Sequence, residues 1–174
     1  CRGLGQMVGE SGGGGSWVVE TPKGDKTTGK INYIVWSECV LCPNCSEHIV
    51  LYDVTVTYET GAVADTFACP NCKHSLTKND CDKARVTVYD DYLQTPIIRI
   101  QYTPVLINYS IGTKRFEKDL DEEDLAKLER IDNLRIDYDL PLDNIEKGDK
   151  SSDPYRVGIT NVHQFYSKRN LYIL

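Results

Sequence analysis

Apolar and polar residues alternate with a period of two through much of the first half of the chain. Every second residue is apolar or aromatic over 31–35 and again over 50–58, and many of these residues are β-branched or aromatic, as strands prefer. The Glu-Thr-Gly sequence at 59–61 predicts a turn, and 62–68 would return as the second strand of a hairpin. The pattern therefore predicts antiparallel strands between residues 30 and 88.

Two further strands are expected over 85–89 and 97–102, followed by a short apolar run at 105–107. Pro96 and Pro104 each lack a backbone N–H, and a missing donor weakens a strand in the interior of a sheet. We therefore expect this ribbon to lie at a sheet edge or to bend at the prolines.

The pattern then changes to a helical one. Asp121 can act as the N-cap, and the acidic residues 122–124 place negative charge at the positive end of the helix dipole. Leu125, Leu128 and Ile131 recur every three residues and predict one apolar face. This segment is expected to form a short acidic helix.

The rest of the chain is expected to contain an irregular stretch, one last helix and a flexible N-terminal tail. Residues 133–153 contain proline and glycine and predict irregular structure. Ser167 can cap a last helix with Leu171 and Leu174 as its apolar face, and the end of the chain would truncate that helix. At the other end, the glycine-rich residues 1–16 predict a flexible tail or linker.

Composition limits the chain to one domain, or to one domain with a small appended module. The chain has 174 residues, of which 40% are hydrophobic and 26% charged, so we expect a folded protein with a thin core. No apolar run approaches the roughly 18 residues of a spanning helix, which predicts a cytoplasmic protein without a membrane partner. Because the chain starts at Cys1 and ends in an apolar stretch, we expect a piece of a longer protein.

The formal charge of -6 is unevenly distributed. Residues 117–153 carry fourteen acidic and six basic side chains, a local balance of -8, which leaves +2 for the rest of the chain. The acidic segment is therefore a poor candidate for contact with a polyanion. Three basic residues and no acidic ones follow Asp153, which directs any nucleic-acid contact toward the C-terminal end or the cysteines.

The most informative chemistry lies in the cysteines. Four of the seven form two identical tetrapeptides, Cys42-Pro43-Asn44-Cys45 and Cys69-Pro70-Asn71-Cys72. Two intervening residues let a tight turn aim both thiolates at one point, and two such knuckles complete the tetrahedral sulfur shell that zinc prefers, at about 2.3 Å. The 23 residues between the knuckles suit a hairpin that brings them together. The spacing predicts a zinc ribbon with Cys42, Cys45, Cys69 and Cys72 as metal ligands.

Other interpretations of the cysteines remain open. Two disulfides or a redox Cys-x-x-Cys pair would use the same residues, although neither predicts two equal knuckles flanking a strand pair. Cys39 also lies two residues from Cys42, but the intervening Val40-Leu41 continues an apolar strand, so we interpret Cys39 as a buried or spare thiol. Cys1 and Cys81 have no second cysteine at the spacing of a knuckle. Because four thiolates complete the site, His48 and His74 are not needed as ligands. Zinc ribbons often have glycine where Ser46 and Lys73 follow the knuckles.

Several longer strings together resemble one family. The chain is similar, over about 17–174, to a region inside bacterial DNA methyltransferases that methylate amino groups, the adenine N6 or cytosine N4 class. The resemblance is carried by both knuckles and by Ile31-Asn32-Tyr33, Val35-Trp36-Ser37, Leu76-Thr77-Lys78, the run from Pro104 to Ser110, the run from Lys114 to Lys118, and the run from Gly158 to Leu171.

The resemblance implies a zinc-containing insertion between two catalytic motifs. One is the glycine-rich motif that holds S-adenosylmethionine, and the other is the Asp-Pro-Pro-aromatic motif that acts on the base amine. The chain contains neither motif: Asp153-Pro154-Tyr155 lacks the second proline, and the glycines at 12–15 follow no strand. We therefore expect the chain alone to be inactive and S-adenosylmethionine to be bound only by the parent enzyme.

The resemblance leads to two functional hypotheses. In the first, the region contributes to DNA recognition or clamping by the parent enzyme, with phosphate contacts from Lys73, His74, Lys78, Lys83, Arg85, Lys114, Arg115, Lys168 and Arg169. In the second, the zinc module is purely structural or binds another protein, including the remainder of the methyltransferase chain. The acidic segment favours the second hypothesis.

The sequence thus predicts an α+β fold in three segments. Residues 1–16 form the tail, 17–90 form a zinc-ribbon β module, and 91–174 form a β-ribbon with the acidic helix and the truncated C-terminal helix.

Overall fold

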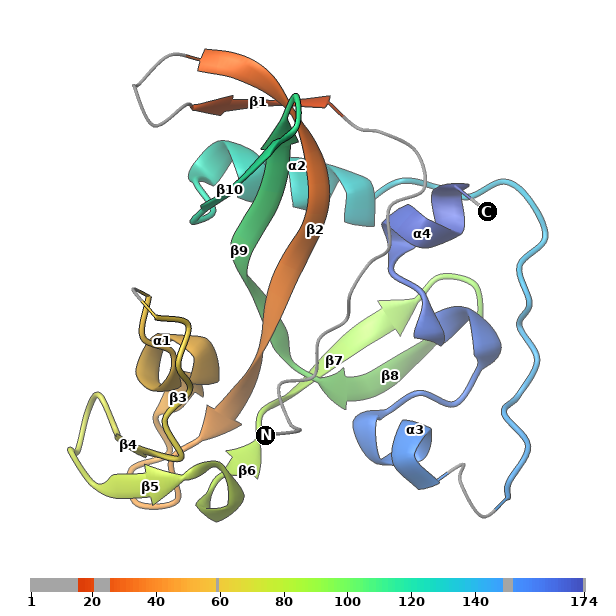
Figure 1. Ribbon diagram of the computed structural model, residues 1–174. Helices are drawn as coiled ribbons and strands as arrows, with labels where there is room; N and C mark the ends of the chain where they lie inside the picture. The colour runs from red at the N-terminus through yellow and green to blue at the C-terminus, as the bar shows by residue number, and fades with distance from the viewer. Residues whose placement is uncertain (1–15, 21–25, 59, 149–151, 174) are drawn as a thin grey trace. The chain divides into compact units, whose positions relative to one another are not determined.

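The computed structural model describes residues 16–20, 26–58, 60–148 and 152–173 (Figure 1). The fold is α+β, with mostly antiparallel strands and a few short helices, in agreement with the predicted class. The predicted tail at 1–16 lies almost entirely outside the described residues.

The secondary-structure elements follow one another closely. The strands are β1 (Ser16–Glu20), β2 (Lys26–Leu41), β3 (His48–Val50), β4 (Thr66–Ala68), β5 (Ser75–Thr77), β6 (Asp82–Lys83), β7 (Arg85–Asp90), β8 (Thr95–Ile100), β9 (Tyr102–Ile111) and β10 (Lys114–Lys118). The helices are α1 (Leu51–Thr55), α2 (Glu122–Asp132), α3 (Ser152–Val157) and α4 (Lys168–Ile173), with 3-10 turns η1 (Lys78–Asp80) and η2 (Val162–Phe165).

The described residues form two compact units. Unit 1 comprises residues 37–103 and 145–160, and unit 2 comprises residues up to 36, 104–144 and from 161 onward. The chain passes between the units within β2, near the start of β9, and again after residues 144 and 160, so each unit takes segments from both halves of the sequence.

Unit 2 contains an antiparallel sheet with the strand order β1-β2-β9-β10. Its core consists of Ile31, Ile34, Ile107 and Tyr109, and the Tyr109 ring stacks on Phe116 of β10 at 5.6 Å between centroids. Polar side chains also join the strands, because the Asn32 amide donates to Asn108 Oδ1 and to Ser110 Oγ, both at 2.8 Å. Ile107, Asn108 and Tyr109 of β9 are buried, so this part of the strand lies in the core of unit 2.

Helix α2 begins where its sequence predicts. The backbone N–H of Asp124 donates to Asp121 Oδ1 at 2.8 Å, so Asp121 is the N-cap. Leu128 and Ile131 pack against the core of unit 2. Leu125 is 47% exposed, so its predicted place on the apolar face is wrong.

The predicted last helix is present as α4, and Leu174 of its predicted apolar face lies outside the described residues. Ser167 Oγ accepts a hydrogen bond from the backbone N–H of Asn170 at 3.3 Å, which caps α4, and Leu171 is buried. Helix α4 contacts α2. Between these helices the chain is irregular from Leu134 to Gly148, apart from an isolated bridge between Asn144 and Asn161.

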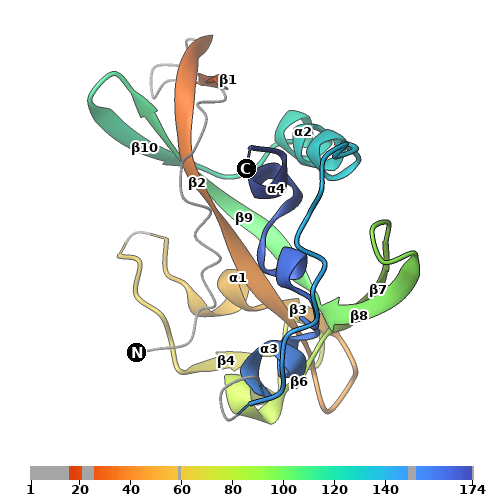
Figure 2. The same ribbon diagram turned by 90° about the vertical axis from the view of Figure 1, so that its right-hand side faces the viewer.

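Unit 1 is built on the end of β2. Strands β3 and β6 pair antiparallel with β2, while β4 pairs with β5. Strands β7 and β8 form the predicted ribbon, in which Pro96 lies opposite Tyr89 in a two-stranded sheet (Figure 2). Among the described residues no helix has both the length and the apolar character needed to cross a membrane.

The predicted strand over 50–58 is wrong. Strand β3 ends at Val50, and residues 51–55 form α1, whose Leu51 and Thr55 are buried. The turn after it forms as predicted, because the N–H of Gly61 donates to Thr57 O at 2.8 Å. The returning segment pairs only briefly with 55–57, and β4 takes β5 as its partner.

Candidate metal centre

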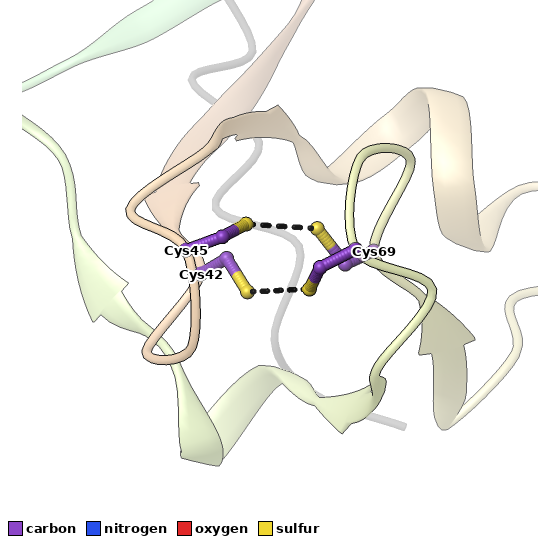
Figure 3. A group of neighbouring side chains, drawn as sticks. Cys42, Cys45 and Cys69 are labelled. Atoms are coloured by element: carbon purple, nitrogen blue, oxygen red, sulfur yellow. Dashed lines mark hydrogen bonds between the residues drawn. The ribbon is translucent and has the colours of Figure 1, made fainter.

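The four predicted ligands converge in unit 1. The sulfur atoms of Cys42 and Cys72 lie 3.7 Å apart, as do those of Cys45 and Cys69 (Figure 3). All four sulfur atoms lie within 4.8 Å of one another. A tetrahedral site with metal–sulfur bonds of about 2.3 Å has sulfur atoms about 3.8 Å apart, so this cluster could bind a metal ion such as zinc.

The two knuckles have the same backbone structure. In the first, the N–H of Cys42 donates to Glu47 O at 2.9 Å and the N–H of Ser46 donates to Cys42 O at 2.8 Å. In the second, the N–H of Cys69 donates to His74 O at 2.9 Å and the N–H of Lys73 donates to Cys69 O at 3.0 Å. Identical tetrapeptides thus fold into identical turns that hold two thiols each.

Both turns end in a left-handed residue. Ser46 has φ of 58° and Lys73 has φ of 61°, in a region where side chains with a Cβ are disfavoured. These are the two positions at which zinc ribbons often have glycine, so the chain accepts this backbone cost in both knuckles. The Lys73 ammonium donates to Pro70 O at 2.7 Å and so lies against its own knuckle.

The thiols differ in exposure and acidity. Cys42 and Cys69 are buried, whereas Cys45 and Cys72 are half-buried. Hydrogen bonds from the Asn44 side chain and from the His74 backbone lower the pKa of Cys72 to about 6. The pKa of Cys45 is raised to about 12, because a hydrogen bond from the Glu47 backbone is outweighed by desolvation and by the other thiols. The lowered pKa of Cys72 favours its thiolate form, which is the form that binds a metal ion.

The other predicted alternatives lie outside this cluster. Cys39 is fully buried, its sulfur lies 3.2 Å from Thr103 Oγ1, and burial raises the pKa of its thiol. His48 Nε2 lies 3.0 Å from Gln101 Oε1, and His74 is exposed. Cys81 packs against the apolar core around Cys42 and Cys69 in unit 1. The six cysteines among the described residues form no disulfide.

A small apolar core supports the knuckles. It is one buried cluster that contains Cys42 and Cys69 together with Val40 of β2, Ile49 of β3, Leu51 of α1, Phe67 of β4 and Leu76 of β5. Apart from β2, the strands that contribute to this cluster are short, with three residues each in β3, β4 and β5. The apolar surface buried around the cysteines is therefore small, and small cores contribute only a few kcal/mol.

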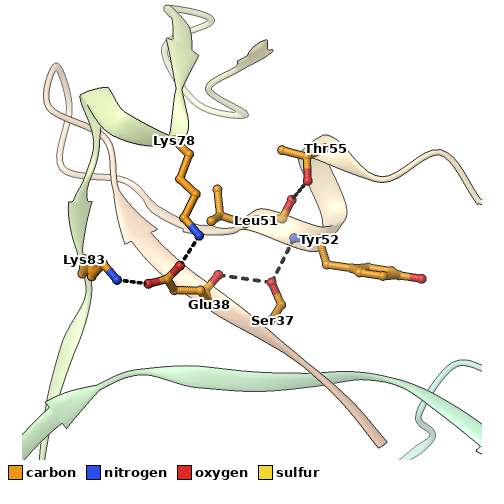
Figure 4. A network of polar contacts seen from close by, with 7 residues as sticks. All are labelled: Ser37, Glu38, Leu51, Tyr52, Thr55, Lys78 and Lys83. Carbon is orange, nitrogen blue, oxygen red and sulfur yellow. Dashed lines mark hydrogen bonds and ion pairs between the residues drawn. The ribbon is translucent and has the colours of Figure 1, made fainter. Parts of the chain in front are cut away.

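A buried carboxylate that the sequence analysis missed links three segments of the ribbon. Glu38 on β2 is 6% exposed, and its oxygens lie 2.5 Å from Lys78 Nζ and 2.6 Å from Lys83 Nζ (Figure 4). The adjacent Ser37 Oγ accepts from the N–H of Tyr52 at 2.9 Å and donates to Glu38 O at 3.1 Å. These contacts fasten η1, β6 and α1 to β2.

Stability should depend on this carboxylate in a defined pH window. Desolvation raises the pKa of Glu38, but hydrogen bonds from Lys78 and Lys83 outweigh it and lower the pKa below its ordinary value. A lowered folded-state pKa gives stability that is present above the unfolded pKa of about 4.3 and is lost as pH falls through the folded value. We expect Glu38→Gln to cost about 1–2 kcal/mol near pH 7, since both lysines are partly solvated.

Denaturant unfolding of both proteins between pH 5 and pH 7 measures this difference, because at lower pH the thiols of the same unit are protonated and would release a bound metal. The difference should be constant across this range, since Glu38 stays ionised throughout it. Asp65→Asn, which removes an exposed carboxylate of the same unit, is the matched control and should stay within about 0.5 kcal/mol at every pH. An effect of Glu38→Gln as small as that of the control would show that the carboxylate charge is unimportant.

The predicted DNA-contacting residues divide between the units. Lys73, His74, Lys78, Lys83 and Arg85 lie in unit 1, and Lys114, Arg115, Lys168 and Arg169 lie in unit 2. Lys78 and Lys83 are held by Glu38, and Arg85 Nη2 donates to Arg156 O at 3.4 Å. Lys114 and Arg115 are exposed on β10, next to the turn that joins it to β9.

No family model matches the chain, and neither a curated protein nor a solved structure matches it.

Proposed function

We propose that unit 1 is a structural zinc ribbon in which Cys42, Cys45, Cys69 and Cys72 hold one zinc ion. The observation that carries this proposal is the convergence of four thiols from two matching knuckles, with sulfur separations close to those of a tetrahedral site. No open ligand position is needed for such a site, because four protein ligands complete it. The metal would have a folding role rather than a catalytic one.

Metal content tests this proposal directly. The 174-residue chain, purified under reducing conditions and dialysed against metal-free buffer, should retain one zinc per chain by elemental analysis. Cobalt substitution should give the intense thiolate charge-transfer and visible bands of a tetrahedral four-sulfur site. A folded, reduced protein without bound metal would overturn the proposal.

We further propose that the chain is a zinc-binding insertion region of an amino-methylating DNA methyltransferase and contributes to DNA contact. The strings that resemble this family support the proposal, and two of them, 104–110 and 114–118, form the β9–β10 hairpin of unit 2. Lys114 and Arg115 are the strongest phosphate-binding candidates, since both are exposed and lie at the start of β10, next to the turn of the hairpin. Lys78 and Lys83 are weaker candidates because Glu38 engages them.

We expect Lys114→Ala/Arg115→Ala to weaken binding of the zinc-loaded chain to a 20-base-pair duplex. Each lost phosphate contact should also reduce the slope of log affinity against log salt by about 0.9. Arg130→Ala/Arg135→Ala is the matched control, because it removes the same charge from the acidic segment and should leave the slope unchanged. Fluorescence anisotropy titrations at several salt concentrations measure both quantities.

The alternative is a purely structural or protein-interaction module, which the acidic balance of 117–153 favours. Absence of duplex binding even at low salt would support this alternative, whereas a steep salt dependence would support phosphate contact.

A further inference from the structure

Three aromatic rings are exposed within eight residues near the C-terminal end of unit 2. Phe165 is 48% exposed, Tyr166 44% and Tyr172 53%. Aromatic side chains of this size are usually mostly buried, because each can remove 150–250 Å² from water. We call residues 165–172 the aromatic segment.

Neighbouring residues fix the backbone of the aromatic segment while its rings face outward. His163 and Gln164 of η2 are buried, and Gln164 Oε1 accepts from the N–H of Asn161 at 3.2 Å. The Asn161 amide in turn donates to Leu142 O at 2.9 Å. On the other side, the Ser167 cap and the buried Leu171 hold α4 in place. The rings are therefore presented by anchored backbone, which lowers the entropy lost when a ligand binds.

One cation shares a helix face with one of the rings. Arg169 and Tyr172 are three residues apart in α4, whereas Phe165 belongs to η2, which precedes this helix. The aromatic segment itself contains two cations, Lys168 and Arg169, and no acidic residue, although its helix α4 contacts the acidic α2. Aromatic rings interleaved with cations are the combination that binds unpaired bases and the phosphates between them.

We propose that the aromatic segment is a stacking surface for the unpaired bases of single-stranded DNA. The inference deepens the proposed DNA-contacting function and rests on it. Paired bases in a duplex have both faces covered by their neighbours, so exposed rings gain more from a single strand than from a duplex. The exposed rings and the two cations of the segment fit this ligand. Leu171, the aliphatic side chain of the segment, is buried, so the exposed apolar surface is aromatic.

The test compares two double variants of the zinc-loaded 174-residue chain with a labelled twelve-nucleotide oligothymidine. Phe165→Leu/Tyr172→Leu removes two rings but keeps apolar side chains, whereas Phe165→Tyr/Tyr172→Phe keeps both rings. We expect the leucine variant to lose affinity about tenfold or more and the ring-retaining variant to stay within about twofold. Zinc content and thermal unfolding should match the unmodified chain in both.

The salt dependence separates stacking from phosphate contact. The leucine variant should keep the slope of log affinity against log salt, and Arg169→Ala should reduce the slope by about 0.7.

The stacking inference is overturned if the leucine and ring-retaining variants bind the single strand equally well. If both variants then still bind the duplex, the proposed DNA-contacting function stays intact. Absence of binding to either DNA overturns both. Self-association that the leucine variant abolishes, without oligonucleotide binding, would assign the rings to protein contact and also overturn the inference.

Discussion

Chelation of zinc is expected to unfold the segment from β3 to β6 in unit 1. A structural zinc site contributes on the order of 10 to 16 kcal/mol of apparent binding free energy, whereas the apolar cluster around Val40, Ile49 and Leu76 contributes only a few. We therefore expect residues 48–83 to lose their fold when the proposed zinc is removed. Amide hydrogen exchange of the reduced chain, measured before and after addition of a chelator, should show loss of protection over residues 48–83.

Single substitutions of the ligands should have the same result. Replacement of Cys42, Cys45, Cys69 or Cys72 by serine should abolish stoichiometric zinc and protection of the ribbon. Cys39→Ser and Cys81→Ser are matched controls in the same unit and should keep the zinc, since both thiols lie outside the four-cysteine cluster. Loss of zinc in Cys39→Ser would show that the ligand register is wrong, and persistent protection after chelation would show that the apolar core suffices.

The four-cysteine cluster was predictable because its geometry is encoded locally. A Cys-x-x-Cys tetrapeptide determines the direction of both thiols within one turn, and two copies of the same tetrapeptide require only that the chain between them return. The cost at Ser46 and Lys73 was visible in the same way, because the turn needs a left-handed residue wherever it occurs. The cap of α2 at Asp121 depends likewise on residues three positions apart.

The segment after β3 shows where local pattern fails. Its alternating Val and Tyr residues favour a strand, yet residues 51–55 form α1. The contacts that decide the structure involve residues distant in sequence. Leu51 packs in the apolar core around Cys42 and Cys69, and the N–H of Tyr52 donates to Ser37 Oγ. Thr55 Oγ1 also donates to Leu51 O at 2.7 Å, a contact between residues four apart that one turn of a helix provides and an extended strand does not.

The role of Glu38 was missed for a related reason. Its two partners follow it by 40 residues or more, so no local spacing indicates the ion pairs. One signal was available, namely a single carboxylate within the apolar run that leads to the first knuckle. A buried carboxylate needs a paired cation, which would have directed attention to the lysines near the second knuckle.

Gly158→Ala is expected to destabilise unit 1 by roughly 3 kcal/mol or more. Gly158 has φ of 88°, and a Cβ there would lie 2.2 Å from Ile98 O and 2.9 Å from Arg99 Cα of strand β8. The substitution therefore combines an unfavourable backbone conformation with a clash against backbone atoms that cannot rotate away. The requirement for glycine arises from close packing of the residue after α3 on the β7–β8 ribbon.

Gly61→Ala separates the two costs of this substitution. Gly61 belongs to the same unit and has φ of 64°, but no atom lies within 4 Å of a Cβ built there. It should therefore show the conformational cost alone, about 1 kcal/mol. Denaturant unfolding of the zinc-loaded proteins, followed through signals of unit 1, measures the difference of roughly 2 kcal/mol attributable to contact with β8. Equal destabilisation by the two alanines would contradict the close approach of Gly158 to Ile98 and leave backbone conformation as the sole requirement for glycine.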